Sequence, residues 1–213
     1  MTVPEYAART KYDRRVAKRY RRDAEGRRGR ENRVLLDLLR GLSPVESLLD
    51  APCGVGRVAA LSELQGIPYT GLDLAPAMLE RAVDRCRDEK RTVAWIRGDL
   101  ESLPVKGRAF DVVLCLRLLH HLPEPTRSRV VQEAARAASR AVVFTYFHPF
   151  ALHYAQRRLK TFLTGRVSHR YSHTSGWIDR CLRDEGWRLA AERGTGFLRE
   201  TRYALFLRDD RDG

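Results

Sequence analysis

Acidic residues and glycines recur at the ends of hydrophobic segments in the first half of this chain. One segment ends at Asp50 and continues into Gly54 and Gly56, a second ends at Asp73, and a third ends near Asp99. Glycines after a strand let the backbone approach a ligand closely, and the start of a following helix favours an anion. A carboxylate 19 residues after Gly54 can accept hydrogen bonds from ribose hydroxyls, and Asp99 could accept from an adenine amino group. The combined pattern predicts a nucleoside-containing ligand.

Each of these residues also has a purely structural interpretation. A loop with two glycines occurs in many tight turns that bind nothing, Asp73 could cap the next helix, and Asp99 could simply end a strand. The ligand interpretation is favoured because the three acids follow successive predicted strands in register.

Short β-rich runs alternate with helical patterns between residues 45 and 146, which is typical of a parallel sheet built from βαβ units. We predict strands over residues 45–50, 67–72, 92–96, 110–116 and 141–146. We predict helices over 57–65, 76–89 and 126–139, the second with an apolar face formed by Met78, Leu79, Ala82 and Val83. Ligands bind at the carboxyl ends of such strands, so the acids should share one edge.

Four segments resemble, in order and at similar spacing, the motifs of class I S-adenosylmethionine-dependent methyltransferases of the ubiquinone/menaquinone-biosynthesis type. They cover residues 50–57, 71–79, 98–104 and 110–122, and a weaker similarity follows from His173 onward. The resemblance implies an α/β fold: a Rossmann-like, doubly wound, seven-stranded and mainly parallel sheet with an antiparallel last strand and helices on both faces. A dinucleotide-binding loop fits less well, because Ala59 stands where its third glycine belongs and Asp99 has no role there.

The resemblance also implies which residues would hold S-adenosylmethionine. Those that would cradle its methionine half are Asp50, Ala51, Cys53, Gly54 and Gly56. Those that would surround its ribose and adenine are Asp73, Leu74, Met78, Asp99 and Leu100. Arg57 matches a common family residue, and Cys115 would line the sulfonium side. Arg117 is unusual, because a cation near a sulfonium is repulsive unless it points toward the substrate.

Four residues near the predicted methyl position could act as a general base or orient the acceptor: His120, His121, Tyr146 and His148. Any of them could instead be a packing residue. No group of histidines, cysteines and acids has metal-ligand spacing, which predicts a metal-independent enzyme.

The formal charge of +13 is concentrated at the two ends of the chain. We predict one methyltransferase domain over 1–213, made of a basic helical arm or lid (1–40), a neutral cofactor-binding core (41–147), a basic substrate-side insert (148–172) and a last helix with a terminal hairpin (173–213). The arm has an apolar stripe at helical spacing, and its Tyr20 could contact the cofactor.

Three functions are compatible with these features. The favoured one is methyl transfer to a small, anionic or lipid-linked acceptor, with peripheral membrane contact as an option. The second is an RNA methyltransferase whose basic arms bind phosphates, and the third is a non-catalytic cofactor-binding protein. The sequence shows neither a hydrophobic leader nor a long apolar run, and its four cysteines have no paired spacing, so we expect a cytoplasmic protein.

Overall fold

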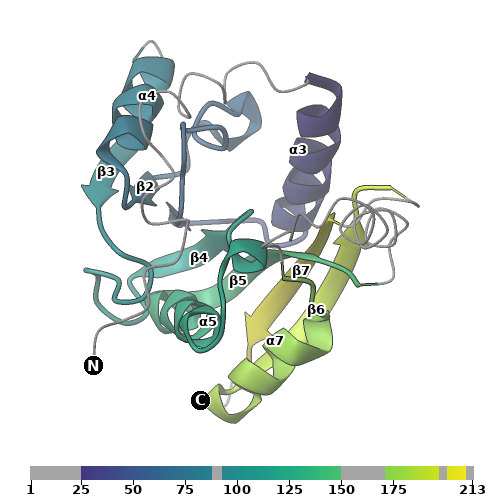
Figure 1. The fold of residues 1–213 in the computed structure, drawn as a ribbon. Coiled ribbons are helices and arrows are strands. Elements are labelled where there is room, and N and C mark those ends of the chain that lie inside the picture. Colours follow the sequence, from purple (N-terminus) through teal and green to yellow (C-terminus); the bar gives the residue numbers. More distant parts are fainter. Residues whose placement is uncertain (1–24, 88–92, 150–170, 197–200, 210–213) are drawn as a thin grey trace, which may run out of the picture.

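A computed structural model describes residues 25–87, 93–149, 171–196 and 201–209 (Figure 1). Its helices are α3 (Glu25–Arg40), α4 (Pro76–Cys86), α5 (Thr126–Ala137) and α7 (Ser175–Leu182). Its strands are β1 (Leu48–Asp50), β2 (Tyr69–Asp73), β3 (Val93–Arg97), β4 (Phe110–Cys115), β5 (Ala138–Phe147), β6 (Trp187–Gly194) and β7 (Thr201–Arg208). Short 3-10 helices are η1 (Ser62–Leu64), η2 (Leu119–His121) and η3 (Arg183–Glu185).

The seven strands form one sheet in the order β3-β2-β1-β4-β5-β7-β6. Strands β1 to β5 pair in parallel, whereas β7 is antiparallel to both β5 and β6. The strand order reverses next to β1, which lies between β2 and β4. The predicted α/β fold with an antiparallel last strand is confirmed.

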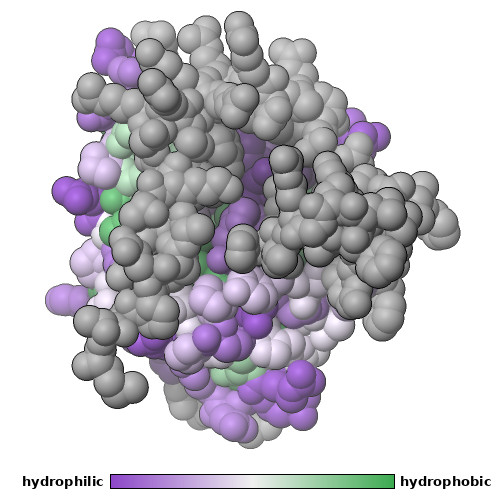
Figure 2. All heavy atoms as spheres, viewed as in Figure 1, coloured by the Kyte–Doolittle hydropathy of each residue, from purple (hydrophilic) through white to green (hydrophobic). Residues whose placement is uncertain are grey.

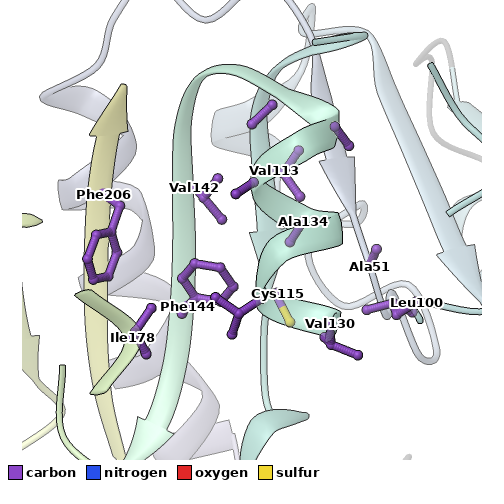
Figure 3. Close-up of a cluster of buried hydrophobic side chains, with 14 of the residues drawn as sticks. Ala51, Leu100, Val113, Cys115, Val130, Ala134, Val142, Phe144, Ile178 and Phe206 are labelled. Carbon is purple, nitrogen blue, oxygen red and sulfur yellow. The ribbon is translucent and has the colours of Figure 1, made fainter. Parts of the chain in front are cut away.

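Helices cover both faces of the sheet because successive residues of the buried strands point to opposite sides. Val113 and Cys115 of β4 pack in a cluster with α5 and α7, as Figure 3 shows for part of that cluster. Val112 and Leu114, the alternate residues of β4, pack in a second cluster that contains the leucines of α3. Both faces of the central strands are therefore buried, as expected for a sheet with helices on both faces.

The helix predicted over residues 57–65 is wrong. The chain there forms successive turns and η1 instead. Gly54 and Gly56 have φ of +55° and +69°, and most of the following hydrogen bonds span three residues, such as Leu61 N–H to the Val58 carbonyl. Two of the apolar residues whose spacing suggested a helix, Val58 and Leu64, are nevertheless buried in the core.

Two smaller predictions also need correction. Val83 is 41% exposed, and the buried residues of α4 are Met78, Ala82 and Cys86, at four-residue spacing. Strand β5 begins at Ala138 because α5 ends at Ala137, two residues earlier than predicted. None of the helices in the described ranges is long and apolar enough to cross a bilayer. Where Figure 2 shows the described residues, hydrophobic side chains form small patches between hydrophilic ones.

Candidate active site

Asp50 ends strand β1 with a carboxylate that is almost completely buried. Asp50 is 2% exposed, and the Tyr69 hydroxyl donates a hydrogen bond of 2.6 Å to Asp50 Oδ2. Its Oδ1 has no hydrogen-bond partner in the described part of the chain. Burial raises the pKa of Asp50 to about 7, against the opposing effects of the Tyr69 hydrogen bond and the Arg57 charge. A cationic ligand group would find a buried, unpaired oxygen here.

Asp73, at the end of β2, holds two loops together. Its Oδ2 accepts a hydrogen bond of 2.9 Å from Gly54 N–H, and its Oδ1 accepts one of 2.9 Å from Ala75 N–H. Burial raises its pKa, and these backbone hydrogen bonds oppose the rise. Asp73 thus bonds Ala75 N–H without capping α4, because the N-cap of that helix is Ala75 and it has no side-chain cap hydrogen bond. Asp73 leaves room for a ligand too, because each carboxylate oxygen has a second lone pair.

The loop around Gly54 leaves space for a ligand. A Cβ atom added to Gly54 would meet no heavy atom of the described residues within 4 Å, whereas one added to Gly56 would lie 3.0 Å from the backbone of Ala82 in α4. Gly56 is thus needed for packing against α4, and Gly54 borders open space. Cys53 N–H donates to the Leu72 carbonyl at 2.8 Å, which fixes the loop against β2.

Asp99 follows β3 at the same edge of the sheet. The parallel pairing of β1, β2 and β3 brings Asp50, Asp73 and Asp99 to the carboxyl ends of three neighbouring strands, as predicted. The Asp99 carboxylate accepts a hydrogen bond of 3.0 Å from Glu101 N–H, and Gly98 N–H donates to the Asp73 carbonyl at 3.2 Å.

The remaining predicted cofactor residues differ in accessibility. Those that are buried are Ala51, Cys53, Met78, Leu100 and Cys115, and Leu74 is half-buried. Cys115 is fully buried among core side chains on the α5 face, close to Phe144 and Val130 in Figure 3. Burial raises the pKa values of Cys53 and Cys115, which keeps both as neutral thiols. Tyr20 lies outside the described residues.

Helix α3 holds the two arginines near the site. The Arg57 guanidinium donates a hydrogen bond to Asn32, and Arg117 Nη1 donates to both carboxylate oxygens of Glu31 at 3.0 and 3.1 Å. Glu31 is 2% exposed. Arg117 has a φ of +59°, and its N–H bonds the Thr145 hydroxyl oxygen at 2.5 Å. The orientation left open in the sequence is thus settled: Arg117 points to α3, and Glu31 neutralises its charge.

The four candidate catalytic residues lie at the ends of β4 and β5. His120 in η2 is 4% exposed, and its ring stacks on Phe147 at a centroid distance of 3.8 Å. Its ring also lies 4.1 Å from that of His121, which is half-buried. Tyr146 is fully buried, and burial together with the nearby Glu192 carboxylate raises its pKa. His148 is half-buried, with its ring 6.5 Å from that of Tyr146.

Sequence reasoning missed two residues next to Tyr146. His173 precedes α7, is 7% exposed, and lies with its ring 5.3 Å from that of Tyr146. Arg127, the second residue of α5, is 9% exposed and faces Trp177. Both residues have mainly polar neighbours in the sequence, so no sequence signal indicated that they are buried. In the described residues, no group of three or more His, Cys, Asp and Glu side chains is arranged to bind a metal ion.

Comparison with known proteins agrees with this geometry. Residues 48–141 match a family model described as a methyltransferase domain. The match covers somewhat less than half of the chain, and it shows that residues 48–141 resemble methyltransferase domains. The matched residues contain β1 to β4, and therefore all three acids of the strand edge.

Relatives of this chain share parts of its sequence. It is 35% identical over 108 residues to 27-O-demethylrifamycin SV methyltransferase of Amycolatopsis mediterranei, covering 48% of this chain and 39% of that protein. It is 29% identical over 136 residues to the ubiquinone biosynthesis O-methyltransferase of Idiomarina loihiensis, covering 62% and 51%. The chain thus spans about two fifths to one half of the length of these two curated relatives.

Solved structures share the fold of this chain. Magnesium protoporphyrin IX methyltransferase from Synechocystis PCC 6803, solved with bound SAH, superposes with a TM-score of 0.71 at 22% identity, covering 86% of this chain and 83% of that one. An O-methyltransferase family protein from Burkholderia thailandensis gives a TM-score of 0.72 at 19% identity, covering 96% and 63%.

Proposed function

We propose that this protein transfers the methyl group of S-adenosylmethionine to a hydroxyl oxygen of a small organic molecule. The match to a methyltransferase-domain model supports the reaction class, and the SAH bound in the Synechocystis PCC 6803 structure supports the cofactor. Oxygen as the methylated atom is supported by the names of relatives, which include a 27-O-demethylrifamycin SV methyltransferase and ubiquinone biosynthesis O-methyltransferases. The observation that carries the proposal is the strand edge where Asp50 and Asp73 flank the open space beside Gly54.

The residues of this edge fit the cofactor chemically. Asp50 Oδ1, buried and without a partner in the described ranges, would accept a hydrogen bond from the cationic amino group of the methionine half. Asp73 would bind the ribose hydroxyls through the lone pairs that Gly54 and Ala75 leave free. Asp99 would accept from the adenine amino group.

The protein's contribution to the reaction is binding and orientation. When bound, S-adenosylmethionine supplies a methyl group on a sulfonium, ready for in-line transfer. Alignment of the two reactants alone accounts for a large part of the rate in such reactions. The pairing of Arg117 with Glu31 supports this role, because it offsets a positive charge that would otherwise repel the sulfonium.

A hydroxyl acceptor must lose its proton, and a general base contributes roughly 10²–10⁴-fold to such a step. Of the four candidate residues, His121 and His148 are partly exposed, whereas His120 and Tyr146 are almost completely buried. We assign His121 and His148 as the residues to test as bases. His120 and Tyr146 would instead support the acceptor side of the site.

The overall charge supports an acceptor that is anionic or lipid-linked, since the excess of basic residues flanks a neutral core. Half of the basic residues in these flanking parts belong to segments 1–24 and 150–170, which lie outside the described residues. A role of these segments in binding RNA remains the alternative to be tested.

The test is methyl transfer from labelled S-adenosylmethionine in an extract that is separated into small molecules, RNA and protein. Label in the small-molecule fraction, lost with Asp73→Asn, is the expected result. Label in RNA that falls steeply with salt would support the RNA alternative and contradict the proposal. Binding of the cofactor without any labelled product would support a non-catalytic role.

A further inference from the structure

Three buried polar side chains lie at the end of β5 and near the starts of α5 and α7, and no hydrogen bond between them pairs the polar atoms described below. Tyr146 belongs to the end of β5, Arg127 to the first turn of α5, and His173 directly precedes Thr174 and α7. They are 0%, 9% and 7% exposed. We call these three residues the Arg127–Tyr146–His173 cluster.

Four polar atoms of the cluster make no hydrogen bond in the described part of the chain. They are Tyr146 Oη, Arg127 Nη1 and both ring nitrogens of His173. Glu192 and Ser175 lie near enough to Tyr146 to shift its pKa, but neither forms a hydrogen bond with its hydroxyl there. Buried polar groups in proteins nearly always have partners. Four unpartnered atoms from three side chains in one place point to a polar ligand.

The cluster combines the positive charge of Arg127 with a neutral His173 ring. Arg127 bonds Glu124 through Nε at 3.2 Å and pairs with it through Nη2 at 3.1 Å, so Nη1 remains available for a second anion. Burial, together with the Arg127 charge, lowers the pKa of His173 to about 4. His173 is therefore neutral at pH 7, with one nitrogen that donates and one that accepts.

Aromatic rings surround the same atoms. The His173 ring lies 5.3 Å from the Tyr146 ring, at an interplanar angle of 28°, and 5.0 Å from the Trp177 ring. The Arg127 guanidinium lies 4.6 Å from the centre of the Trp177 ring and 5.6 Å from that of Tyr171. Such an arrangement favours a flat ligand, because rings stack on other rings and on guanidinium planes.

The cluster lies at the carboxyl end of β5, on the acceptor side of the switch in strand order. His173 N–H donates to the Phe147 carbonyl at 3.0 Å, and Tyr171 N–H donates to the His120 carbonyl at 2.9 Å. These bonds fix the segment before α7 against β5 and η2. The three acids assigned to the cofactor follow β1, β2 and β3 at the same edge of the sheet, where ligands of such folds bind.

We propose that the Arg127–Tyr146–His173 cluster binds the methyl acceptor, and that this acceptor is an aromatic molecule carrying both a hydroxyl group and a negative charge. This inference rests on the proposed function. Arg127 Nη1 binds the negative charge, the accepting nitrogen of His173 takes a hydrogen bond from the hydroxyl group, and Tyr146 supplies a further hydrogen bond. Trp177 covers the ring of the acceptor.

The test uses the full chain saturated with S-adenosylhomocysteine and two probes, 4-hydroxyphenylacetate and its uncharged analogue 4-hydroxyphenylacetamide. Calorimetry should show that the acid binds at least about tenfold more tightly than the amide. Arg127→Gln should remove this preference by weakening the acid alone. His173→Phe, which keeps a ring but removes the nitrogens, should weaken both probes. Arg180→Gln, at an exposed arginine of α7, is the matched control and should change neither affinity.

The affinity for S-adenosylhomocysteine, measured first on each protein, shows that the variant is folded. If the wild-type protein does not bind S-adenosylhomocysteine, the proposed function itself is contradicted. If it binds S-adenosylhomocysteine but not 4-hydroxyphenylacetate, or binds acid and amide equally well, only the assignment of the acceptor site is overturned. An equal loss of affinity for 4-hydroxyphenylacetate in Arg127→Gln and Arg180→Gln would also overturn the assignment of the acceptor site.

Discussion

The ion pair between Glu31 of α3 and Arg117 after β4 offers a quantitative test of how α3 is held over the site. Removing one partner of a fully buried pair costs about 3–5 kcal/mol, whereas an exposed pair contributes about 0–1 kcal/mol. The Glu31 side chain is 3% exposed and that of Arg117 is 41% exposed, so this pair lies between the two limits. We expect Glu31→Gln to lower the free energy of unfolding by about 2 kcal/mol.

Urea unfolding followed by circular dichroism measures this loss, and the melting temperature should fall by about 4–8 °C. Asp37→Asn is the matched control on the same helix, because the Asp37–Arg40 pair is exposed at both ends and should change stability by less than about 0.5 kcal/mol. A double-mutant cycle with Arg117→Met should give a coupling of about 1–2 kcal/mol. If Glu31→Gln costs no more than Asp37→Asn, the pair does not anchor α3 and our account of Arg117 is wrong.

Two further predictions concern the cofactor loop. Asp50 must be ionised to bind a cationic amino group, and its pKa is raised to about 7, so affinity for S-adenosylmethionine should rise between pH 5.5 and 7, approaching about tenfold per pH unit. Calorimetry at several pH values measures this rise, and a slope that persists in Asp50→Asn would refute the assignment. Gly54→Ala should cost about 1–2 kcal/mol of stability through its positive φ and abolish cofactor binding by filling open space. Gly56→Ala should destabilise the protein more than Gly54→Ala, because its new Cβ would lie 3.0 Å from Ala82. Thermal unfolding measures the stability of both variants, and calorimetry measures their cofactor affinity. A larger loss of stability in Gly54→Ala than in Gly56→Ala would contradict our assignment of the loop.

Much of the fold could be predicted because local patterns and tertiary packing agree in the central strands. β4 is hydrophobic on both faces, as a strand buried between two helical layers must be, and its alternate residues enter the two core clusters. The segment after Gly56 could not be predicted, since its apolar spacing fits both a helix and a series of buried turns. In the structure this segment forms turns, and it follows two glycines with positive φ, Gly54 and Gly56.

Asp50, Asp73 and Asp99 could be predicted as site residues because each lies at or just after the end of a strand that the sequence pattern predicts. The long-range contacts of Arg117 and of the Arg127–Tyr146–His173 cluster could not be predicted in this way. Glu31 lies 86 positions before Arg117, and only the packing of α3 against the sheet brings the two together. His173 lies 27 positions after Tyr146, and its burial depends on the segment that bonds Phe147 and precedes α7. Contacts of this kind are properties of the assembled sheet edge.

Calorimetric titration of S-adenosylmethionine into wild-type protein, Asp73→Asn and Asp111→Asn tests the central claim most directly. Asp111 is a matched control, because it also accepts a backbone N–H bond, from Glu46, but belongs to the start of β4 at the opposite edge of the sheet. The account predicts one cofactor per wild-type chain, a loss of at least about tenfold in affinity for Asp73→Asn, and unchanged affinity for Asp111→Asn. Equal affinity of folded Asp73→Asn and wild-type protein would contradict it.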